Sequence, residues 1–266
     1  MDFETITLGP ASGCDAAEGI QLLTLNRPEA MNAMNTRMFR ELRAAVAALS
    51  TDATLRVLVI TGAGAKAFSA GGDLKERRGM SDDTWRAQHQ LIEEVFLAVK
   101  DFARPVIAAV EGHAHGGGLE LALMADFIIA AGNATFSLPE GRRGIMPGGG
   151  GIQNLVRAAG MRRAKQLLLT GAEFDGAQAL AWGVVTQLVD TGQALAAATV
   201  VARRIAETAP MSARYIKLSA SRGGEVDFHT GYMLDIACYN VLVSSQDRLE
   251  GVLAFNERRP PRWFDR

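Results

Sequence analysis

The chain has 266 residues, of which 48% are apolar, and its 28 basic and 29 acidic residues give a formal net charge of −1. This length and apolar share allow a full hydrophobic core that needs no disulfides. The balanced charge offers no broad field to attract nucleic acid or an anionic membrane, so neither is expected as a partner.

The first elements in chain order alternate between strand and helix. Short alternating or apolar runs predict strands at residues 3–8 and 19–25. Apolar residues at helical spacing predict a helix over 34–52. The apolar run 56–62 is typical of a strand that a parallel sheet buries on both faces. A strand, a helix and a second strand in this order indicate a right-handed crossover unit.

The same pattern then repeats and places the chain in the α/β class. We expect a helix over 84–102 and a strand over 105–112, followed by a glycine-rich turn, a short helix and a strand over 126–131. Such alternation is typical of an α/β fold rather than a sandwich.

The last part of the chain has a helical pattern from about residue 151 onward, interrupted by a short strand at 184–189. No linker rich in proline or serine separates the parts. We therefore expect an α/β core over 1–190 and a helical region over 191–266 within one structural domain.

The sequence also favours a reducing compartment. Cys14 and Cys238 lack metal-ligand and disulfide-scaffold spacing, which predicts free thiols. No apolar run approaches the ~20 residues of a membrane span, and the first residues lack the features of a secretory signal. A cytoplasmic location is expected, although a matrix protein without its targeting peptide would look the same.

Two glycine-rich stretches do not fit nucleotide binding. Residues 62–68 lack the dinucleotide pattern GxGxxG, and residues 147–155 lack the Lys-Ser/Thr pair of a phosphate-binding loop. HExxH and GxSxG motifs are absent, and the four histidines are not spaced as ligands. We therefore expect neither a metal nor a separate cofactor.

Two other glycine-rich turns could carry chemistry. "KAFSAGGDLKE" (66–76) and "HAHGGGLE" (113–120) each follow a predicted strand and open a helix, which Asp73 could cap in the first case. Exposed backbone amides at two adjacent strand ends could converge on one oxygen and form an oxyanion hole. The alternative is that both segments are simply tight turns.

A pair of glutamates is the second chemical signal. Glu120 lies inside an apolar run, where an ionised carboxylate is costly unless it is paired, hydrogen-bonded or protonated. Glu140 follows a proline 20 residues later, with one predicted strand between the two. The intervening elements could bring the two side chains together for proton transfer, whereas an isolated glutamate in a loop is usually solvated.

The order of these motifs resembles the crotonase superfamily and, within it, the enoyl-CoA hydratases. Four segments carry the resemblance, and a fifth is similar to the C-terminal half of the family: residues 26–35, 57–74, 105–130 and 136–151, then 162–189. The resemblance implies a crotonase-like spiral of ββα units with a helical C-terminal trimerisation region. It also implies an acyl-CoA thioester as substrate, with coenzyme A as part of that substrate, and a homotrimer or a hexamer.

The resemblance also assigns roles to particular residues. It implies that Glu120 orients and deprotonates water and that Glu140 supplies a proton, while the amides of Gly72 and Gly117 hold the thioester oxygen. The residues that it places at the coenzyme A and acyl portions are Ala70, Gly72, Asp73, Leu74, Lys75, Gly117, Gly148, Phe255 and Arg258, the last two in some members from a neighbouring subunit. An exposed cationic tail is the alternative for Arg258.

Several residues have more than one interpretation. Arg142 and Arg143 could favour a polar or carboxylate-bearing substrate, or could simply face outward. His115 could touch the pocket or fill a strand end. We expect Trp85, Trp182 and the Met-rich segment 31–38 to be core or pocket walls.

The resemblance favours hydration of 2-enoyl-CoA to 3-hydroxyacyl-CoA. The alternatives are another crotonase reaction, such as isomerisation of an enoyl-CoA, dehydration of a hydroxyacyl-CoA or hydrolysis of an acyl-CoA, and a non-catalytic RNA-binding family member. The near-neutral charge and the intact glutamate pair disfavour RNA binding. Chain length, branching, polarity of the acyl group and pathway are not fixed by the sequence.

Overall fold

The computed structural model describes residues 2–11, 13 and 18–266, and its larger sheet has six strands. In spatial order these are β1 (Ile6–Pro10), β2 (Ile20–Leu25), β3 (Val57–Gly62), β5 (Val106–Val110), β7 (Phe127–Ala131) and β10 (Gln187–Val189). Only β1 runs antiparallel to its neighbour. The central strands are buried along their length, as the apolar runs predicted.

A second sheet of four short strands was not expected from the sequence. It contains β4 (Ala67–Ser69), β6 (His113–His115), β8 (Thr135–Ser137) and β9 (Phe174–Asp175), with β9 antiparallel to β8. The predicted glycine-rich turn after β5 is therefore partly strand. Three-residue strands are too short to give a periodic signal, so the sequence pattern could not reveal them.

The helices follow the predicted order with small differences at their ends. They are α1 (Thr36–Ser50), α2 (Leu74–Arg77), α3 (Asp82–Lys100), α4 (Gly117–Met124), α5 (Gly151–Ala159), α6 (Met161–Thr170), α7 (Gly176–Ala181), α8 (Ala194–Ala206), α9 (Pro210–Gly223), α10 (Phe228–Val243) and α11 (Gln246–Glu257). Two 3-10 turns occupy Pro28–Ala30 and Glu140–Arg143.

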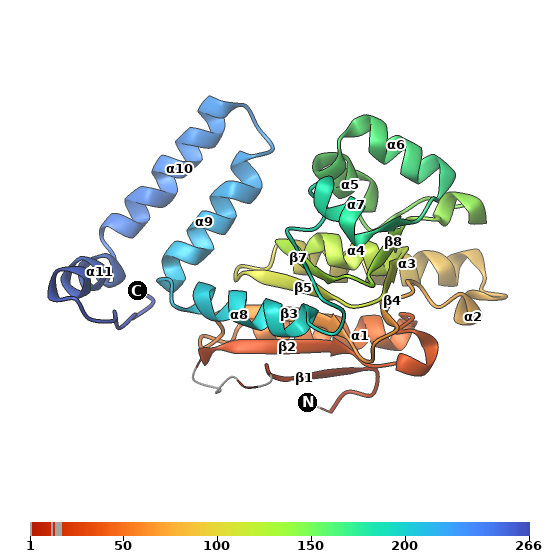
Figure 1. The fold of residues 1–266 in the computed structure, drawn as a ribbon, viewed down its shortest axis with the longest axis horizontal. Helices are drawn as coiled ribbons and strands as arrows, with labels where there is room; N and C mark the ends of the chain where they lie inside the picture. The colour runs from red at the N-terminus through yellow and green to blue at the C-terminus, as the bar shows by residue number, and fades with distance from the viewer. Residues whose placement is uncertain (1, 12, 14–17) are drawn as a thin grey trace.

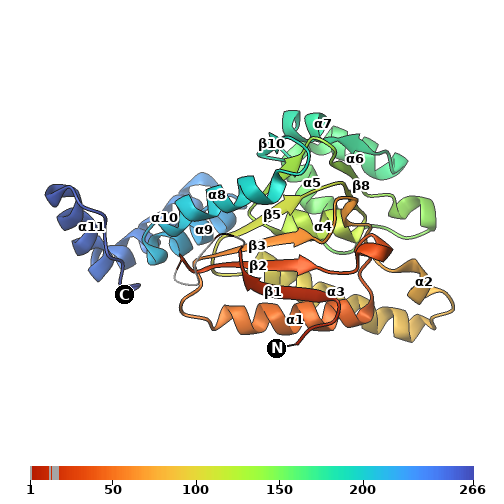
Figure 2. The same ribbon diagram turned by 60° about the horizontal axis from the view of Figure 1, so that its bottom comes forward.

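Both faces of the large sheet are covered by helices, as Figures 1 and 2 show. The amphipathic helices α1 and α3 bury residues such as Phe39 and Phe96 in the main core, where the two rings meet edge to face. On the other face, α8 packs small residues, among them Ala198 and Ala202, against β3 and β5. The small residues allow close packing of the helix on the sheet.

The C-terminal helices α9, α10 and α11 extend to one side of the sheets (Figure 1). Helix α10 has 16 residues, but only Gly231 and Cys238 on it are buried. The helical character predicted for the region 191–266 is confirmed, while the division of the chain at residue 190 stays a prediction.

Two further expectations concern the cysteines and membrane-spanning segments. Cys238 is a buried free thiol, whereas Cys14 lies outside the described residues. No helix in the described part of the chain is both long and apolar enough to cross a membrane.

Candidate active site

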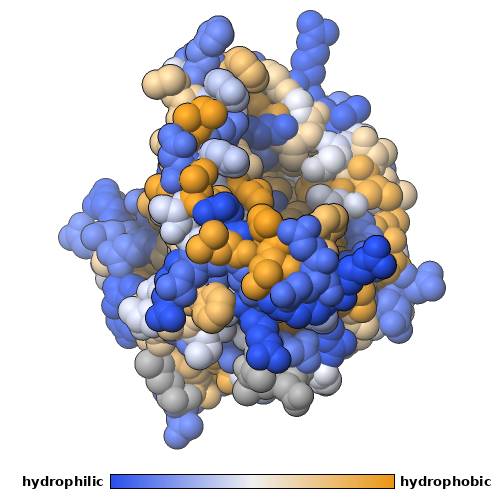
Figure 3. Space-filling view, turned by 90° about the vertical axis from the view of Figure 1, so that its left-hand side faces the viewer, coloured by the Kyte–Doolittle hydropathy of each residue, from blue (hydrophilic) through white to orange (hydrophobic). Residues whose placement is uncertain are grey.

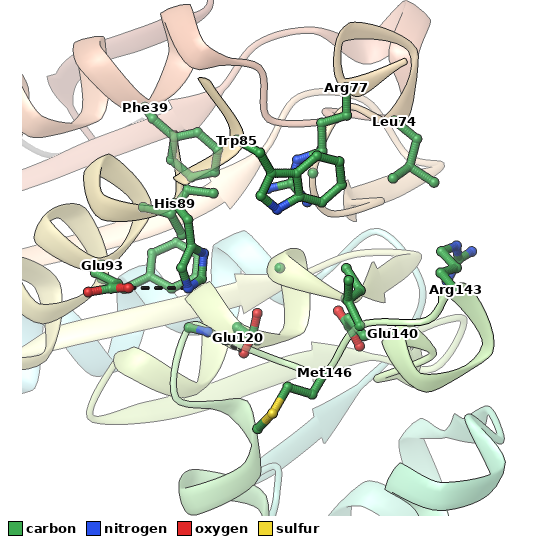
Figure 4. A pocket seen from close by; sticks show the side chains of 18 of the residues that line it. Phe39, Leu74, Arg77, Trp85, His89, Glu93, Glu120, Glu140, Arg143 and Met146 are labelled. Atoms are coloured by element: carbon green, nitrogen blue, oxygen red, sulfur yellow. Dashed lines mark hydrogen bonds and ion pairs between the residues drawn. The ribbon is translucent and has the colours of Figure 1, made fainter. Parts of the chain in front are cut away.

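A pocket of about 820 Å³ lies between α2, α3, α4 and the segment that follows β8 (Figure 4). Its size is within the range of small-molecule sites. The pocket brings together residues that the sequence placed far apart, including Ala70, Gly72, Leu74, Gly117, Glu120, Glu140 and Gly148.

Glu120 lies in the first turns of α4, and only 5% of its surface is exposed. Its Oε1 accepts hydrogen bonds from the backbone amides of Gly149 at 2.7 Å and Gly151 at 3.0 Å. Burial raises the pKa of Glu120 to about 7, and the nearby Glu140 carboxylate acts in the same direction, while the amides of Gly151 and Gly149 oppose the rise. The carboxyl can therefore exchange a proton near neutral pH.

Glu140 opens the 3-10 turn after β8 and is half-buried. Its Oε2 is buried and has no hydrogen-bond partner among the described residues. Burial raises the pKa of Glu140 above its usual range. Figure 4 shows Glu120 and Glu140 both pointing into the pocket.

The amides of Gly72 and Gly117 lie beside each other at this pocket. A Cβ on Gly117 would be 3.6 Å from Gly72 N, and a Cβ on Gly71 would be 3.0 Å from Gly117 N. Neither amide donates to a protein acceptor within the described ranges. Gly117 is the first residue of α4, where backbone amides have no partner inside the helix. The two donors are therefore free for a ligand oxygen.

Residues 70–75 have two kinds of role, because some line the pocket and others hold the turn in place. Ala70, Gly72 and Leu74 line the pocket, whereas Asp73 and Lys75 do not. Asp73 caps α2, as predicted, by accepting from the amides of Lys75 and Glu76. It also pairs with Arg27 at 2.9 Å. Asp73 thus holds the turn that presents Gly72.

Phe255 and Arg258 do not reach the pocket of their own chain. Phe255 lies on α11 and is 84% exposed, and Arg258 ends that helix, also exposed. Figure 1 shows α11 at the opposite end of the molecule from α2. A contact with coenzyme A from these residues requires a second copy of the chain.

The two arginines after Glu140 differ in position. Arg142 is exposed and donates to the Thr170 carbonyl, outside the pocket. Arg143 is also exposed but lines the pocket rim. The outward interpretation therefore fits Arg142, while Arg143 is a basic group at the edge of the pocket.

His115 lines the pocket and also belongs to a polar cluster behind it. Its Nε2 lies 3.0 Å from Glu173 Oε2 and 3.1 Å from Thr135 Oγ1, and His113 Nδ1 lies 2.8 Å from that same hydroxyl. The ligand-type atoms of both histidines and Glu173 lie within 4.8 Å of one another, a grouping that the sequence spacing did not suggest. Burial lowers the pKa of His115. Thr135 Oγ1 links the two histidine rings within this cluster.

The aromatic and methionine residues behave as pocket or core walls. Trp85 and Met31 line the pocket. Met34 and Met38 are buried in the main core, and Trp182 packs against it.

Sequence reasoning missed three contributors to the site. Gly149 and Gly151 supply the amides that bind Glu120, and backbone donors leave no signal in residue type. Arg77 also lines the pocket, near both glutamates. Its only signal was a cationic side chain directly after the turn that carries Gly72.

Comparisons with known proteins agree with this geometry. The sequence profile of the enoyl-CoA hydratase/isomerase family matches residues 15–266. The chain is 39% identical over 249 residues to the mitochondrial methylglutaconyl-CoA hydratase of Mus musculus, covering 92% of this chain and 79% of that protein. It is 37% identical over 259 residues to the crotonyl-CoA hydratase of Syntrophomonas wolfei subsp. wolfei, covering 97% of each.

The fold has a close counterpart among solved structures. An enoyl-CoA hydratase from Bacillus anthracis superposes with a TM-score of 0.94 at 36% identity, covering 99% of this chain and 100% of that one. This overlap confirms the fold class expected from the order of the sequence motifs.

Proposed function

Because the chain belongs to the enoyl-CoA hydratase/isomerase family, we propose that its pocket adds water across the double bond of a 2-enoyl-CoA to give a 3-hydroxyacyl-CoA. The observation that carries this proposal is the pair of carboxyls, Glu120 and Glu140, both with raised pKa, in one pocket with two unpartnered amides. The reaction needs both kinds of group at once.

In this proposal, the steps of the reaction are divided between these groups. The Gly72 and Gly117 amides bind the thioester oxygen and stabilise the charge that develops there as an enolate forms. Removing one such donor typically costs ~3 to 4 kcal/mol in the transition state. Ionised Glu120 takes a proton from water as the water oxygen attacks Cβ, and protonated Glu140 gives its proton to Cα.

The amides of Gly149 and Gly151 fix which oxygen of Glu120 does this work. They occupy Oε1, so Oε2 is the oxygen that faces the water. The carboxyl of Glu140, which lines the same pocket, is the corresponding proton donor.

The nearest rival is double-bond isomerisation. Moving one proton between two carbons can be done by a single carboxylate, whereas addition of water uses a base for the water and an acid for the carbon. The presence of two buried carboxyls in one pocket favours hydration.

We also propose that the chain assembles as a homotrimer or a hexamer of two trimers, and that Phe255 and Arg258 contact the coenzyme A bound to a neighbouring copy. The apolar faces of α9, α10 and α11 support this assembly. Phe228 is 77% exposed, Met233 72% and Tyr239 65%, which is more apolar surface than helices of a monomer usually show. Figure 3, viewed from the side of these helices, shows hydrophobic patches between hydrophilic residues.

For location, we propose a reducing compartment. The free thiol of Cys238 fits such a setting. Some relatives are named mitochondrial proteins, so the cytoplasm and the mitochondrial matrix are the two candidates.

The decisive experiment adds crotonyl-CoA to the purified protein and follows the absorbance of the conjugated thioester. Hydration removes the conjugation, so the absorbance falls, and a 3-hydroxyacyl-CoA is recovered. If the product contains no added water and its double bond has moved, the result would support isomerisation instead. No reaction with any enoyl-CoA in a panel of acyl groups would refute the proposal.

A further inference from the structure

A cationic side chain, Arg77, lies in the pocket beside the two glutamates. Arg77 is half-buried at the end of α2 and lines the pocket. Its Nε donates to Gln88 Oε1 at 2.8 Å, and its guanidinium lies 4.5 Å from the centre of the Trp85 ring. Figure 4 shows the side chain projecting over the cavity next to Trp85. Stacking and this hydrogen bond fix the plane of the guanidinium.

The support of Arg77 is itself rigid. Gln88 is only 4% exposed, and its Nε2 donates to Thr36 Oγ1 at 2.7 Å and to Glu76 Oε2 at 2.8 Å. The amide oxygen of Gln88 therefore points at Arg77 in a fixed orientation. A side chain held in this way loses little further freedom when it binds a ligand.

The guanidinium of Arg77 has no ion-pair partner within 4.0 Å in the described part of the chain. Its two terminal nitrogens, Nη1 and Nη2, also have no hydrogen-bond acceptor there. Glu76, the nearest carboxylate in sequence, is engaged by the Thr36 amide at 2.9 Å and by Gln88. Glu120 and Glu140 attract Arg77 through the pocket without pairing with it.

Such a group calls for a ligand of a particular kind. A cation removed from water is costly unless an anion or hydrogen-bond acceptors replace the water. Two free nitrogens on one planar guanidinium match the two oxygens of a carboxylate. Burial lowers the pKa of Arg77, but the guanidinium stays charged.

The position of Arg77 limits the length of that ligand. A Cβ on Gly72 would lie 3.3 Å from Arg77 Cζ and 3.4 Å from Nη1, so the guanidinium is next to Gly72, whose amide we propose as a donor to the thioester oxygen. In a five-carbon acyl group, the far carboxyl carbon is about 5 Å from the thioester carbon. A short dicarboxylic acyl group thus spans from the oxyanion amides to Arg77, whereas a long chain would have to pass it.

We propose that Arg77 binds a carboxylate at the far end of a short acyl chain, and that the preferred substrate is the coenzyme A thioester of an unsaturated dicarboxylic acid. This inference rests on the proposed hydratase function. Arg143, an exposed residue that also lines the pocket, adds a further positive charge to it. The Trp85 and Gln88 contacts make Arg77 the specificity-determining residue of the pocket.

The test compares two substrates of equal length that differ at the far end. Glutaconyl-CoA has a terminal carboxylate, and 2-pentenoyl-CoA has a methyl group in its place. We expect the wild-type protein to show a higher kcat/KM for glutaconyl-CoA. In Arg77→Met, the ratio of the two kcat/KM values should fall by at least about 30-fold, with most of the loss in KM for glutaconyl-CoA. Both substrates meet the same glutamates, so the ratio cancels any effect of Arg77 on them.

The control is Arg78→Met, which removes the same charge from the adjacent exposed residue outside the pocket lining. This variant should keep the wild-type ratio. Arg77→Lys keeps the charge without the fork of two nitrogens, and its ratio should fall between those of the wild type and Arg77→Met. If Arg77→Met does not fold, the wild-type ratio and Arg77→Lys decide the question.

The outcomes separate this inference from the proposed function. Equal wild-type kcat/KM values for the two substrates, or an equal loss for both in Arg77→Met, would overturn the role of Arg77 while leaving hydration intact. If the wild type hydrates neither these substrates nor crotonyl-CoA, the proposed function itself fails.

Discussion

Replacing Glu120 with glutamine tests both the chemistry and the energetics of the buried carboxyl. Because Oε1 accepts both backbone amides, a glutamine can keep these bonds with its own Oε1 and direct its amide nitrogen into the pocket. The shape of the site is thus retained, while proton exchange is lost. We expect Glu120→Gln to lower hydration of crotonyl-CoA by at least the ~10²-fold typical of one positioned acid or base.

The same substitution should stabilise the protein at alkaline pH. The pKa of Glu120 is raised from 4.5 to about 7, so between these pH values the native state binds more protons than the unfolded state. The free energy of unfolding therefore falls as pH rises through this window. The difference of pKa corresponds to a penalty of about 3 kcal/mol, present in full above pH 7. A neutral glutamine escapes this penalty.

The assay is urea unfolding of wild type and Glu120→Gln at pH 5 and pH 8. The free energy of unfolding of Glu120→Gln minus that of the wild type should increase by roughly 2 to 3 kcal/mol from pH 5 to pH 8. Glu29→Gln, at a carboxylate whose side chain is 71% exposed, is the control and should show no such growth. A stability difference that does not change with pH would refute the claim that burial raises the pKa of Glu120. Full hydration activity in Glu120→Gln would refute its role as the base.

Three further predictions concern the pair, the metal and the assembly. Glu140→Gln should also lower the rate of hydration by at least ~10²-fold. The double variant Glu120→Gln/Glu140→Gln should be little slower than the slower single variant, because the two carboxyls act as one unit. Steady-state kinetics in which the two losses are fully additive would contradict this. Dialysis against a chelator should leave the rate unchanged, since backbone amides and carboxyls carry the chemistry, and a loss restored by zinc or magnesium would show otherwise. Light scattering at micromolar concentration should give the mass of a trimer or a hexamer, and a monomer would exclude the proposed contact of Phe255 with a neighbouring site.

The longer helices and strands could be predicted from the sequence because each shows its apolar pattern over many residues. Helices α1 and α3 show apolar residues at helical spacing, and β3 and β5 are continuous apolar runs. The second sheet escaped because β4, β6 and β8 have three residues each, and their pairing depends on contacts distant in sequence.

The site was predictable where residue type itself carried the signal. Glu120 stood out as a charge within an apolar run, and the glycine turns marked where backbone amides could be exposed. Arg77 did not stand out, because it follows lysine and glutamate and precedes another arginine, so nothing in the sequence separates it from an exposed charged turn. Its difference from Arg78 arises only when α3 brings Trp85 and Gln88 against it.

Two of the groups that lower the pKa of Glu120 against the effect of burial are main-chain amides, which side-chain substitution cannot easily remove. A Cβ on Gly149 would overlap the Phe96 ring, and one on Gly151 would lie 2.8 Å from Glu120 Cγ. Substitution of a pocket-lining side chain such as Met146 therefore leaves both amide donors of Glu120 in place. This separation lets substrate preference diverge among descendants of one ancestor while the reaction itself is inherited intact.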